Sequence, residues 1–198
     1  MMQKGQYFEA ILRSPKTVFT LKDVALLWGE PSTQAVRVRL SYYVSHSKLY
    51  RVHKGIYAKD KRYDKLELAT RIYTPSYVSF ETILSQEGLT FQFYTQVSVA
   101  SYLTREIEVD GQAYSFKKIK DPVLTNPGGI ENRNESSFAT KERAFLDTLY
   151  IHTDYYFDNL NGLDWKKVFE LLPIYQNKRM TGRVNKLYKL QARRNHET

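Results

Sequence analysis

The chain of 198 residues contains no cysteine, and this absence removes several classes of chemistry at once. Disulfide bonds, thiolate nucleophiles and zinc sites with cysteine ligands are all excluded. The sequence also has no apolar run near the roughly 20 residues that a helix needs to cross a bilayer. Its first residues lack the charged and then apolar pattern of a secretion signal. We therefore expect a cytoplasmic protein with no membrane partner.

The patterns of common catalytic and metal sites are missing as well. No Glu-x-Lys motif of a metal-dependent nuclease is present, and the nearest match, Asp164-Trp165-Lys166, falls at a helix start where aspartate usually caps the backbone. Glu142 and Asp147 do not stack on one helical face, so we expect them to bond a nearby arginine or the backbone. The four histidines have no ligand spacing. These observations predict no catalytic residue, no metal site and no cofactor.

Positive charge is what the chain has in excess, and it is concentrated at both ends. The net charge is +9. Residues 1–65 hold 13 Lys and Arg against 5 acidic residues, residues 66–176 hold 10 against 15, and residues 177–198 hold 7 against 1. A basic head and tail around an acidic middle place nucleic-acid binding at the two ends. Composition alone is equally compatible with Lys and Arg that only solvate the surface.

Residues 20–59 have the pattern of two helices followed by a basic hairpin. Thr20 begins a capping box for the first helix, Gly29 ends that helix, and Ser32 can cap the next one. The glycine of His53-Lys54-Gly55 permits a tight turn between two short β-prone runs at 49–52 and 56–59. The buried side of the second helix is expected to consist of Val36, Leu40, Tyr43 and Val44.

A further helix is expected at residues 6–13, because apolar residues recur there at helical spacing. The order of helix, helix, helix and hairpin predicts an N-terminal winged helix-turn-helix DNA-binding domain over residues 1–62. The charged segment 60–65 is the expected domain boundary. Residues 66–73 are expected to start the second domain as a short helix or strand.

Residues 66–198 are expected to form an α+β domain with a small, mostly antiparallel sheet and C-terminal helices, the last of them basic. Asp110-Gly111 is a strong hairpin signal. The predicted elements are a helix at 79–87 capped by Ser79, strands within 91–102 and 106–119, a loop at 126–137, and helices at 140–150, 165–172 and 182–194. Phe91, Phe93 and Tyr94 are expected to pack in the sheet or core, although aromatic side chains on a strand can also stack on single-stranded bases.

Three segments together resemble one bacterial family. They are LYRVHKGIYA at 49–58, PSYVSFETIL at 75–84 followed by Gly88-Leu89, and FATKERAFLD at 138–147. In order and spacing they are similar to the AbiEi family of antitoxins, from type IV toxin–antitoxin and abortive-infection systems. The resemblance covers roughly residues 7–152. Lys141 stands where the family often has proline, and Ile56 replaces a commoner valine.

The resemblance implies a transcriptional repressor of its own operon that also neutralises a nucleotidyltransferase toxin, generally without a stable protein complex. We expect it to bind an inverted repeat in its own promoter as a homodimer on double-stranded DNA. A second interpretation is a protein-binding module whose acidic second domain holds a toxin directly. A third, an enzyme acting on nucleic acid, requires acidic residues distant in the sequence to converge in space.

The candidate DNA-binding side chains come from the second head helix and from the hairpin. Gln34, Arg37 and Ser41 share one solvent-facing side, where such groups pair with base edges. Arg39 lies on the other flank and is expected to meet phosphate or a neighbouring carboxylate. The full set for the head is Ser32, Thr33, Gln34, Arg37, Arg39, Ser41, Arg51, His53 and Lys54. Additional phosphate contacts are predicted for Lys48, Arg183, Lys186 and Lys189.

Overall fold

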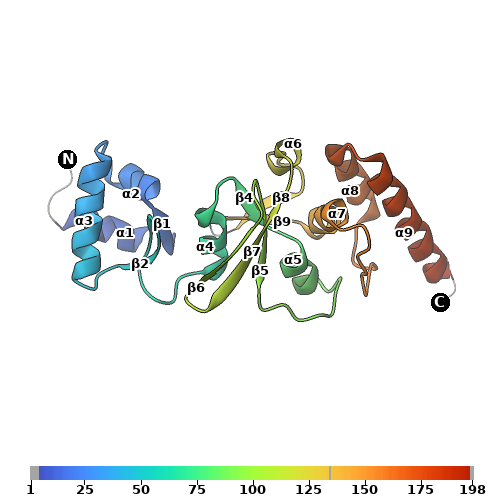
Figure 1. The fold of residues 1–198 in the computed structure, drawn as a ribbon, viewed down its shortest axis with the longest axis horizontal. Helices are drawn as coiled ribbons and strands as arrows, with labels where there is room; N and C mark the ends of the chain where they lie inside the picture. The colour runs from blue at the N-terminus through green and yellow to red at the C-terminus, as the bar shows by residue number, and fades with distance from the viewer. Residues whose placement is uncertain (1–4, 134, 197–198) are drawn as a thin grey trace.

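The structure, a computed structural model, describes residues 5–133 and 135–196. The fold is α+β, with two sheets, and Figure 1 shows a helical head, a central sheet and C-terminal helices in succession along the long axis. The elements are α1 (Gln6–Arg13), β1 (Val18–Thr20), α2 (Leu21–Trp28), α3 (Thr33–Ser45), β2 (Tyr50–His53), β3 (Ile56–Ala58), α4 (Lys65–Ile72), β4 (Ser76–Val78), α5 (Glu81–Gln86), β5 (Val97–Ser101), β6 (Arg105–Val109), β7 (Gln112–Lys118), α6 (Asp121–Leu124), β8 (Ile130–Arg133), β9 (Ser136–Ala139), α7 (Lys141–Ile151), α8 (Trp165–Leu171), the 3-10 helix η1 (Leu172–Tyr175) and α9 (Lys178–His196).

The head consists of α1 to α3 and an antiparallel sheet in the order β1-β3-β2. The predicted capping box is present, because the Thr20 side chain and Asp23 each accept a backbone hydrogen bond from the other residue. Gly29 ends α2 in the left-handed conformation, with φ of 60°. The three helices, β1 and β3 enclose a head core of Tyr7, Ile11, Phe19, Val24, Trp28, Val36, Leu40, Tyr43, Leu49 and Tyr57.

The strands β1 and β3 lie between two hydrophobic cores and contribute side chains to both. Side chains alternate across a strand, so Phe19 and Tyr57 enter the head core while Val18, Ile56 and Ala58 face the larger core of the central sheet. The sequence pattern does not predict β1, because a run of three residues is too short to show alternation. The head is therefore packed directly on the rest of the chain.

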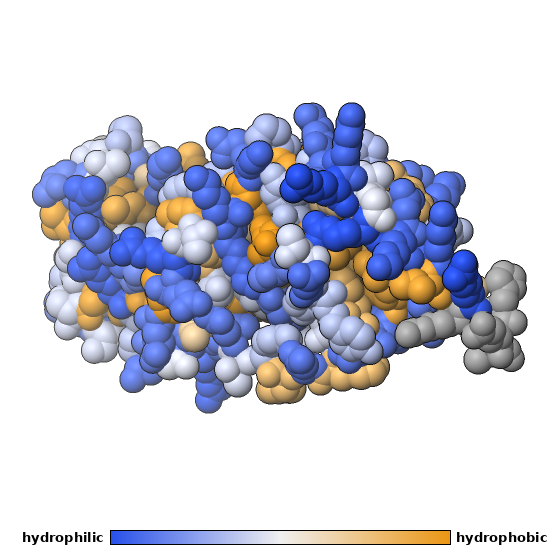
Figure 2. Space-filling view, turned by 45° about the vertical axis from the view of Figure 1, so that its right-hand side comes forward, coloured by the Kyte–Doolittle hydropathy of each residue, from blue (hydrophilic) through white to orange (hydrophobic). Residues whose placement is uncertain are grey.

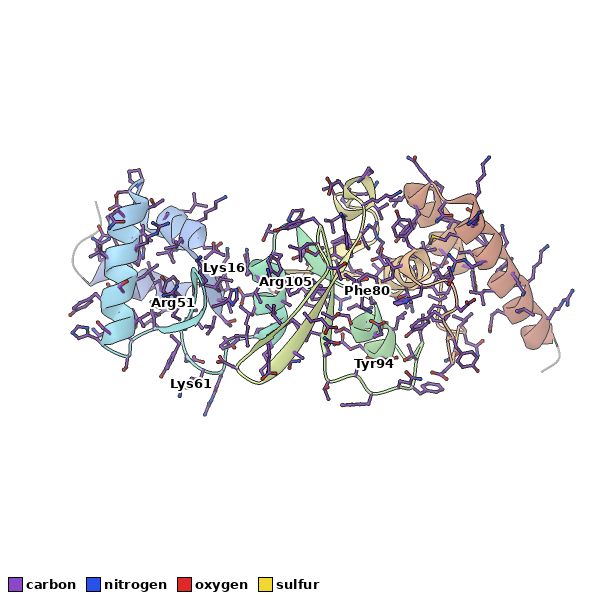
Figure 3. The ribbon with its side chains drawn as sticks, in the orientation of Figure 1. Lys16, Arg51, Lys61, Phe80, Tyr94 and Arg105 are labelled. Atoms are coloured by element: carbon purple, nitrogen blue, oxygen red, sulfur yellow. The ribbon has the colours of Figure 1, made fainter. Side chains whose placement is uncertain are left out.

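Polar contacts reinforce this junction. The backbone N–H and hydroxyl of Thr17 both donate to Glu67 on α4, at 2.8 and 2.6 Å. Lys16 lies between the head and the central sheet (Figure 3) and pairs with Asp23 at 2.6 Å. Arg71 of α4 approaches the same carboxylate at 3.8 Å. These contacts join the beginning of β1 and the start of α2 to α4.

The central sheet has six strands in the order β6-β7-β5-β4-β9-β8. Two neighbouring pairs, β5 with β7 and β4 with β9, are parallel and the other three are antiparallel. The sheet is thus larger and more mixed than predicted. The segment 126–137, expected as a loop, contains β8 and the start of β9, and the strand expected from residue 91 begins only at Val97. The mostly polar and exposed β8 shows no apolar alternation that a sequence pattern could reveal.

The start of α5 differs from the prediction. Ser79 does not cap this helix, because Phe80 occupies the N-cap position with φ of 54° and without a side-chain cap. The fully buried Ser79 hydroxyl instead donates to Asp147 Oδ2 at 2.8 Å. Ser79 therefore forms a hydrogen bond to a residue distant in the sequence and does not cap the helix.

Helices α7 and α8 begin where the caps predict. Thr140 caps α7 by accepting from Arg143 N, and Asp164 caps α8 by accepting from Lys166 N and Lys167 N. Helix α9 begins at Lys178, four residues before the predicted start. Its buried apolar residues, Met180 and Val184, belong to the larger core.

A buried ion pair lies at the centre of the larger core. Arg143 and Asp147, both on α7 and both fully buried, are joined by Nε and Oδ1 at 3.3 Å. The guanidinium also donates to Tyr77 Oη at 3.0 Å and to the backbone oxygens of Val123 and Gly128 at 2.6 and 2.7 Å. The expectation that Asp147 bonds a nearby arginine is confirmed. Glu142 likewise bonds the backbone, since Oε1 accepts from Asp164 N at 3.2 Å.

We predict that Arg143→Met lowers the free energy of unfolding by about 3–5 kcal/mol, because it leaves the Asp147 carboxylate buried without its cation. Urea unfolding monitored by circular dichroism measures the change. The matched control is Arg133→Met, which breaks a pair with Glu131 whose side chains are 58% and 48% exposed. It is expected to cost less than about 1 kcal/mol. Equal losses in the two variants would contradict the central role of the buried pair.

We also predict an acid-dependent contribution from Asp23. Burial alone would raise the pKa of this carboxyl, but hydrogen bonds from Lys16 and Thr20 and the charge of Arg71 lower the pKa below its ordinary value. Such a group contributes stability that is present above its unfolded pKa, about 3.9, and is lost as the pH falls through the folded pKa. The stability difference between wild type and Asp23→Asn should be largest above about pH 5 and shrink below pH 4 in urea titrations. A difference independent of pH would show that the charge of Asp23 is irrelevant.

Candidate nucleic-acid interface

Helix α3 lies at one end of the molecule, away from the central sheet (Figure 1). Val36, Leu40 and Tyr43 are buried against the other head helices, as the spacing predicts. Gln34, Arg37 and Ser41 are exposed on the opposite side. The predicted division of this helix into a buried and a solvent-facing side is confirmed.

Two apolar side chains share the exposed side of α3. Val38 is 61% exposed and Tyr42 is 51% exposed. Sequence reasoning did not include them among the candidate residues, although their helical spacing from Gln34 and Ser41 signals the same side. The exposed face of α3 thus combines hydrogen-bonding, cationic and apolar groups, which are the three kinds of group that read base edges.

The start of α3 presents polar groups, and the Glu30 carboxylate just before it accepts from Ser32 N at 3.1 Å. Ser32 Oγ accepts from Ala35 N at 3.3 Å, which confirms the predicted cap, and Thr33 is exposed. No acidic residue occurs between Glu30 and Asp60. The helix N-terminus and the hairpin therefore belong to one continuous stretch that contains only cationic charges.

Arg39 lies in a different environment from the one predicted. Its guanidinium lies over the Tyr7 ring, 3.6 Å from the centroid, and 5.3 Å from the Trp28 ring. The half-buried side chain covers the aromatic part of the head core. Because Arg39 lies on the flank of α3, its side chain points toward α1 and packs on the head core. A contact with phosphate or with a neighbouring carboxylate had been expected instead.

The hairpin places two of its three candidate residues in solvent. Arg51 on β2 and Lys54 in the turn are exposed, while His53 is half-buried. The ladder between β2 and β3 is irregular between Arg51 and His53, and Gly55 has φ of 75°. Figure 3 shows Arg51 beside α3, at the same end of the molecule as Lys61.

Several head cations are already engaged inside the molecule. Lys16 pairs with Asp23, and Lys59 donates to the backbone oxygens of Leu12 and Ser14 at the end of α1. Lys48 is exposed but its ammonium lies 5.6 Å from the Phe8 ring. By contrast, no ion pair within the described part of the chain includes Arg37, Arg51 or Lys54.

The predicted phosphate contacts of the tail separate into two groups. Arg183 faces inward, where its guanidinium donates to the backbone oxygens of Leu149, His152 and Thr153 at 2.7, 2.7 and 2.8 Å. It satisfies the carbonyl end of α7, whose partial negative charge favours a cation, so the prediction of a phosphate contact is not supported there. Lys186 and Lys189 are exposed on α9, at the end of the molecule opposite to α3 (Figure 1).

A polar cluster in the central region was not found from the sequence. Lys117 Nζ lies 2.7 Å from both carboxylate oxygens of Glu81, and His152 Nε2 lies 3.9 Å from Glu81 Oε1. Burial lowers the pKa of His152, and the charge of Lys117 adds to this effect. Within residues 5–133 and 135–196, no group of three His, Cys, Asp or Glu is arranged to hold a metal ion.

The prediction for the aromatic segment after α5 was wrong. Phe91, Phe93 and Tyr94 were expected in the sheet or core, yet they are 73%, 95% and 37% exposed. They precede β5 in a loop without regular structure, beside a hollow of about 520 Å³. Their alternating spacing is typical of a strand, but no neighbouring strand pairs with residues 91–96 in the described structure.

None of the described helices has the length and apolar character that crossing a membrane requires. Comparison of the sequence with protein-family models and with curated proteins finds no match.

Proposed function

We propose that the chain is a DNA-binding transcriptional repressor whose residues 1–62 form a winged helix-turn-helix. The observation that carries this proposal is the acid-free stretch between Glu30 and Asp60, which folds into α3 and the β2–β3 hairpin with Arg37, Arg51 and Lys54 exposed. In this assignment α3 is the recognition helix and the hairpin is the wing.

The geometry of α3 suits the major groove of duplex DNA. Its 13 residues span about 20 Å at 1.5 Å per residue, and a groove about 12 Å wide admits one helix. Gln34, Arg37 and Ser41 contact base edges in this arrangement. Arg51 and Lys54 contact phosphate or the minor groove, because the wing lies beside the groove that the helix enters.

Two copies bind an inverted repeat in the promoter of their own gene, with half-sites about one helical turn, or roughly 34 Å, apart. The chain acts in the cytoplasm, carries out no catalytic step, and counters a nucleotidyltransferase toxin without forming a stable complex with it. This antitoxin role is supported by the sequence resemblance to the AbiEi family. The resembling segments 75–84 and 138–147 lie together in the fold, through the pairing of Val78 with Phe138 and the hydrogen bond from Ser79 to Asp147.

The full chain is expected to shift the DNA upstream of its own gene at submicromolar concentration in about 0.1 M salt. Arg37→Ala should reduce discrimination between this DNA and random duplex by about 1–3 kcal/mol, because base-edge contacts carry specificity. Lys54→Ala should weaken binding to both duplexes alike and flatten the slope of log affinity against log salt by about one unit.

The control for these variants is Arg13→Ala, which removes the same charge from the head at an exposed position on α1. It is expected to leave both affinities unchanged. No shift of the upstream DNA by wild type would refute DNA binding by the head. Equal losses for Arg37→Ala and Lys54→Ala on both duplexes would refute the division between base and phosphate contacts.

A second candidate function, direct binding of a toxin, is favoured by the exposed Phe91 and Phe93. Exposed aromatic side chains close together in the chain are typical of protein-binding surfaces. They lie in the acidic part of the chain, which suits a basic partner.

If this second function holds, a toxin encoded next to the gene should co-purify with the tagged chain, and Phe91→Ser with Phe93→Ser should abolish the co-purification. The control is Leu26→Ser, which removes an apolar side chain that is 83% exposed in the head and should leave co-purification intact. A toxin that is neutralised in cells but never co-purifies would exclude direct binding and agree with the first proposal.

A further inference from the structure

Helix α9 carries a stripe of cations that the DNA-binding head does not explain. Arg179, Lys186, Lys189 and Arg193 recur at separations of seven, three and four residues and are all exposed, so they lie on one side of the helix. At 1.5 Å per residue the stripe is about 21 Å long. The described helix, Lys178–His196, contains no acidic residue.

The cations of this stripe have no partners in the described structure. No ion pair among residues 5–133 and 135–196 includes any of the four. Figure 2, in which this end of the molecule comes forward, shows hydrophilic side chains over much of the end where α9 lies. A polyanion can therefore contact the stripe without breaking an internal salt bridge.

The other side of α9 is fixed against the protein. Met180 and Val184 are fully buried, Leu187 packs on the larger core, and Arg183 donates to the last carbonyl groups of α7. A helix that lies on a membrane needs a free apolar face to insert among the lipids. Among the described side chains of α9, Tyr188 and Leu190 remain 42% and 47% exposed. They are two positions apart and so lie on opposite sides of the helix. They do not form the continuous apolar face that insertion needs, which favours a ligand that binds charge.

Gly182 is independent evidence that the cationic side of α9 is open to a ligand. It lies within the stripe, between Arg179 and Lys186, and a Cβ added there would meet no atom within 4 Å. Glycine is less favourable than alanine inside a helix, and the packing of this chain does not require it. Its lack of a side chain opens the helix surface beside a shallow hollow of about 370 Å³, which is lined by Gly182, Asn185, Lys186, Lys189, Leu190 and Arg193.

We propose that the α9 stripe binds the phosphate backbone of a second duplex DNA segment, so that one copy of the chain bridges two segments. Duplex DNA carries a phosphate every 3.4 Å along each strand, and Gly182 permits the close approach of a backbone. Because α3 and α9 lie at opposite ends of the molecule (Figure 1), the segment on α9 is distinct from the one on α3. Bridging rests on the proposed function of the head, whereas phosphate binding by α9 does not.

The test is a two-step capture on a surface. A duplex is immobilised, the full chain is bound to it, and a second, labelled duplex is passed over the surface. Lys186→Ala with Lys189→Ala should lower capture of the second duplex at least tenfold and reduce the salt slope of that step by about two units. The matched control, Lys166→Ala with Lys167→Ala, removes two exposed lysines from α8 and should capture like wild type.

Gly182→Gln is the second variant, because it keeps the charge and replaces glycine with a better helix former. It should lower capture of the second duplex while the melting temperature stays equal or rises. The proposal is overturned if wild type captures no second duplex or if the α9 variants capture it as well as wild type does. It is also overturned if the α8 control loses as much capture of the second duplex as the α9 variants. Binding of vesicles rich in phosphatidylserine without capture of duplex would also overturn it.

Adding Arg51→Ala and Lys54→Ala separates this proposal from the function of the head. If the head does not bind DNA, these two substitutions leave binding to the immobilised duplex unchanged. If α9 binds phosphate, the binding that persists in the head variant disappears when Lys186 and Lys189 are also replaced. Residual binding that survives all four substitutions would contradict the role of α9.

Discussion

Removing a guanidinium and a carboxylate from water costs several kcal/mol per charge, and the cost is offset only when both groups find well-placed partners. Arg143 and Asp147 meet this requirement in the larger core. The guanidinium reaches Tyr77 on β4, the end of α6 and the loop before β8, while Asp147 accepts from Ser79 and from Tyr175 at 2.6 Å. Burial raises the pKa of the Asp147 carboxyl even so. The pair therefore fixes the position of α7 against the sheet and against η1. The packing of the larger core depends on these contacts.

This central unit holds the head at a defined place. Hydrogen bonds from Thr17 to Glu67, and the packing of β1 and β3 between the two cores, hold the head on the central sheet while Arg37, Arg51 and Lys54 stay exposed. Segments 75–84 and 138–147 supply Tyr77, Ser79, Arg143 and Asp147, so the residue pattern of these two segments is explained by folding. The residues proposed to touch DNA lie elsewhere, on α3 and the hairpin.

The sequence predicted features that depend on near neighbours in the chain. The caps at Thr20, Thr140 and Asp164 and the hairpin at Asp110-Gly111, with φ of 48° and 71°, follow from local backbone chemistry. The exposed side of α3 followed from helical spacing. Features that depend on distant contacts were missed. Helical spacing predicts the side of the helix on which Arg39 and Arg183 lie, but not the aromatic ring or the carbonyl groups that they contact. It also cannot predict the hydrogen bond from Ser79 to a residue 68 positions away. The parallel pairs of the sheet and its short polar strand β8 were missed for the same reason.

The central claim is that the exposed side of α3 lies against the bases of duplex DNA. Site-specific photo-crosslinking tests it most directly, with a photoreactive amino acid in place of Gln34 and the DNA upstream of the gene as the probe. The matched position is Gln86, which is also exposed but lies at the end of α5 in the central region. The account predicts a crosslink to DNA from position 34 and none from position 86. Crosslinking from position 86 alone, or from neither position under conditions where the DNA is bound, would contradict it.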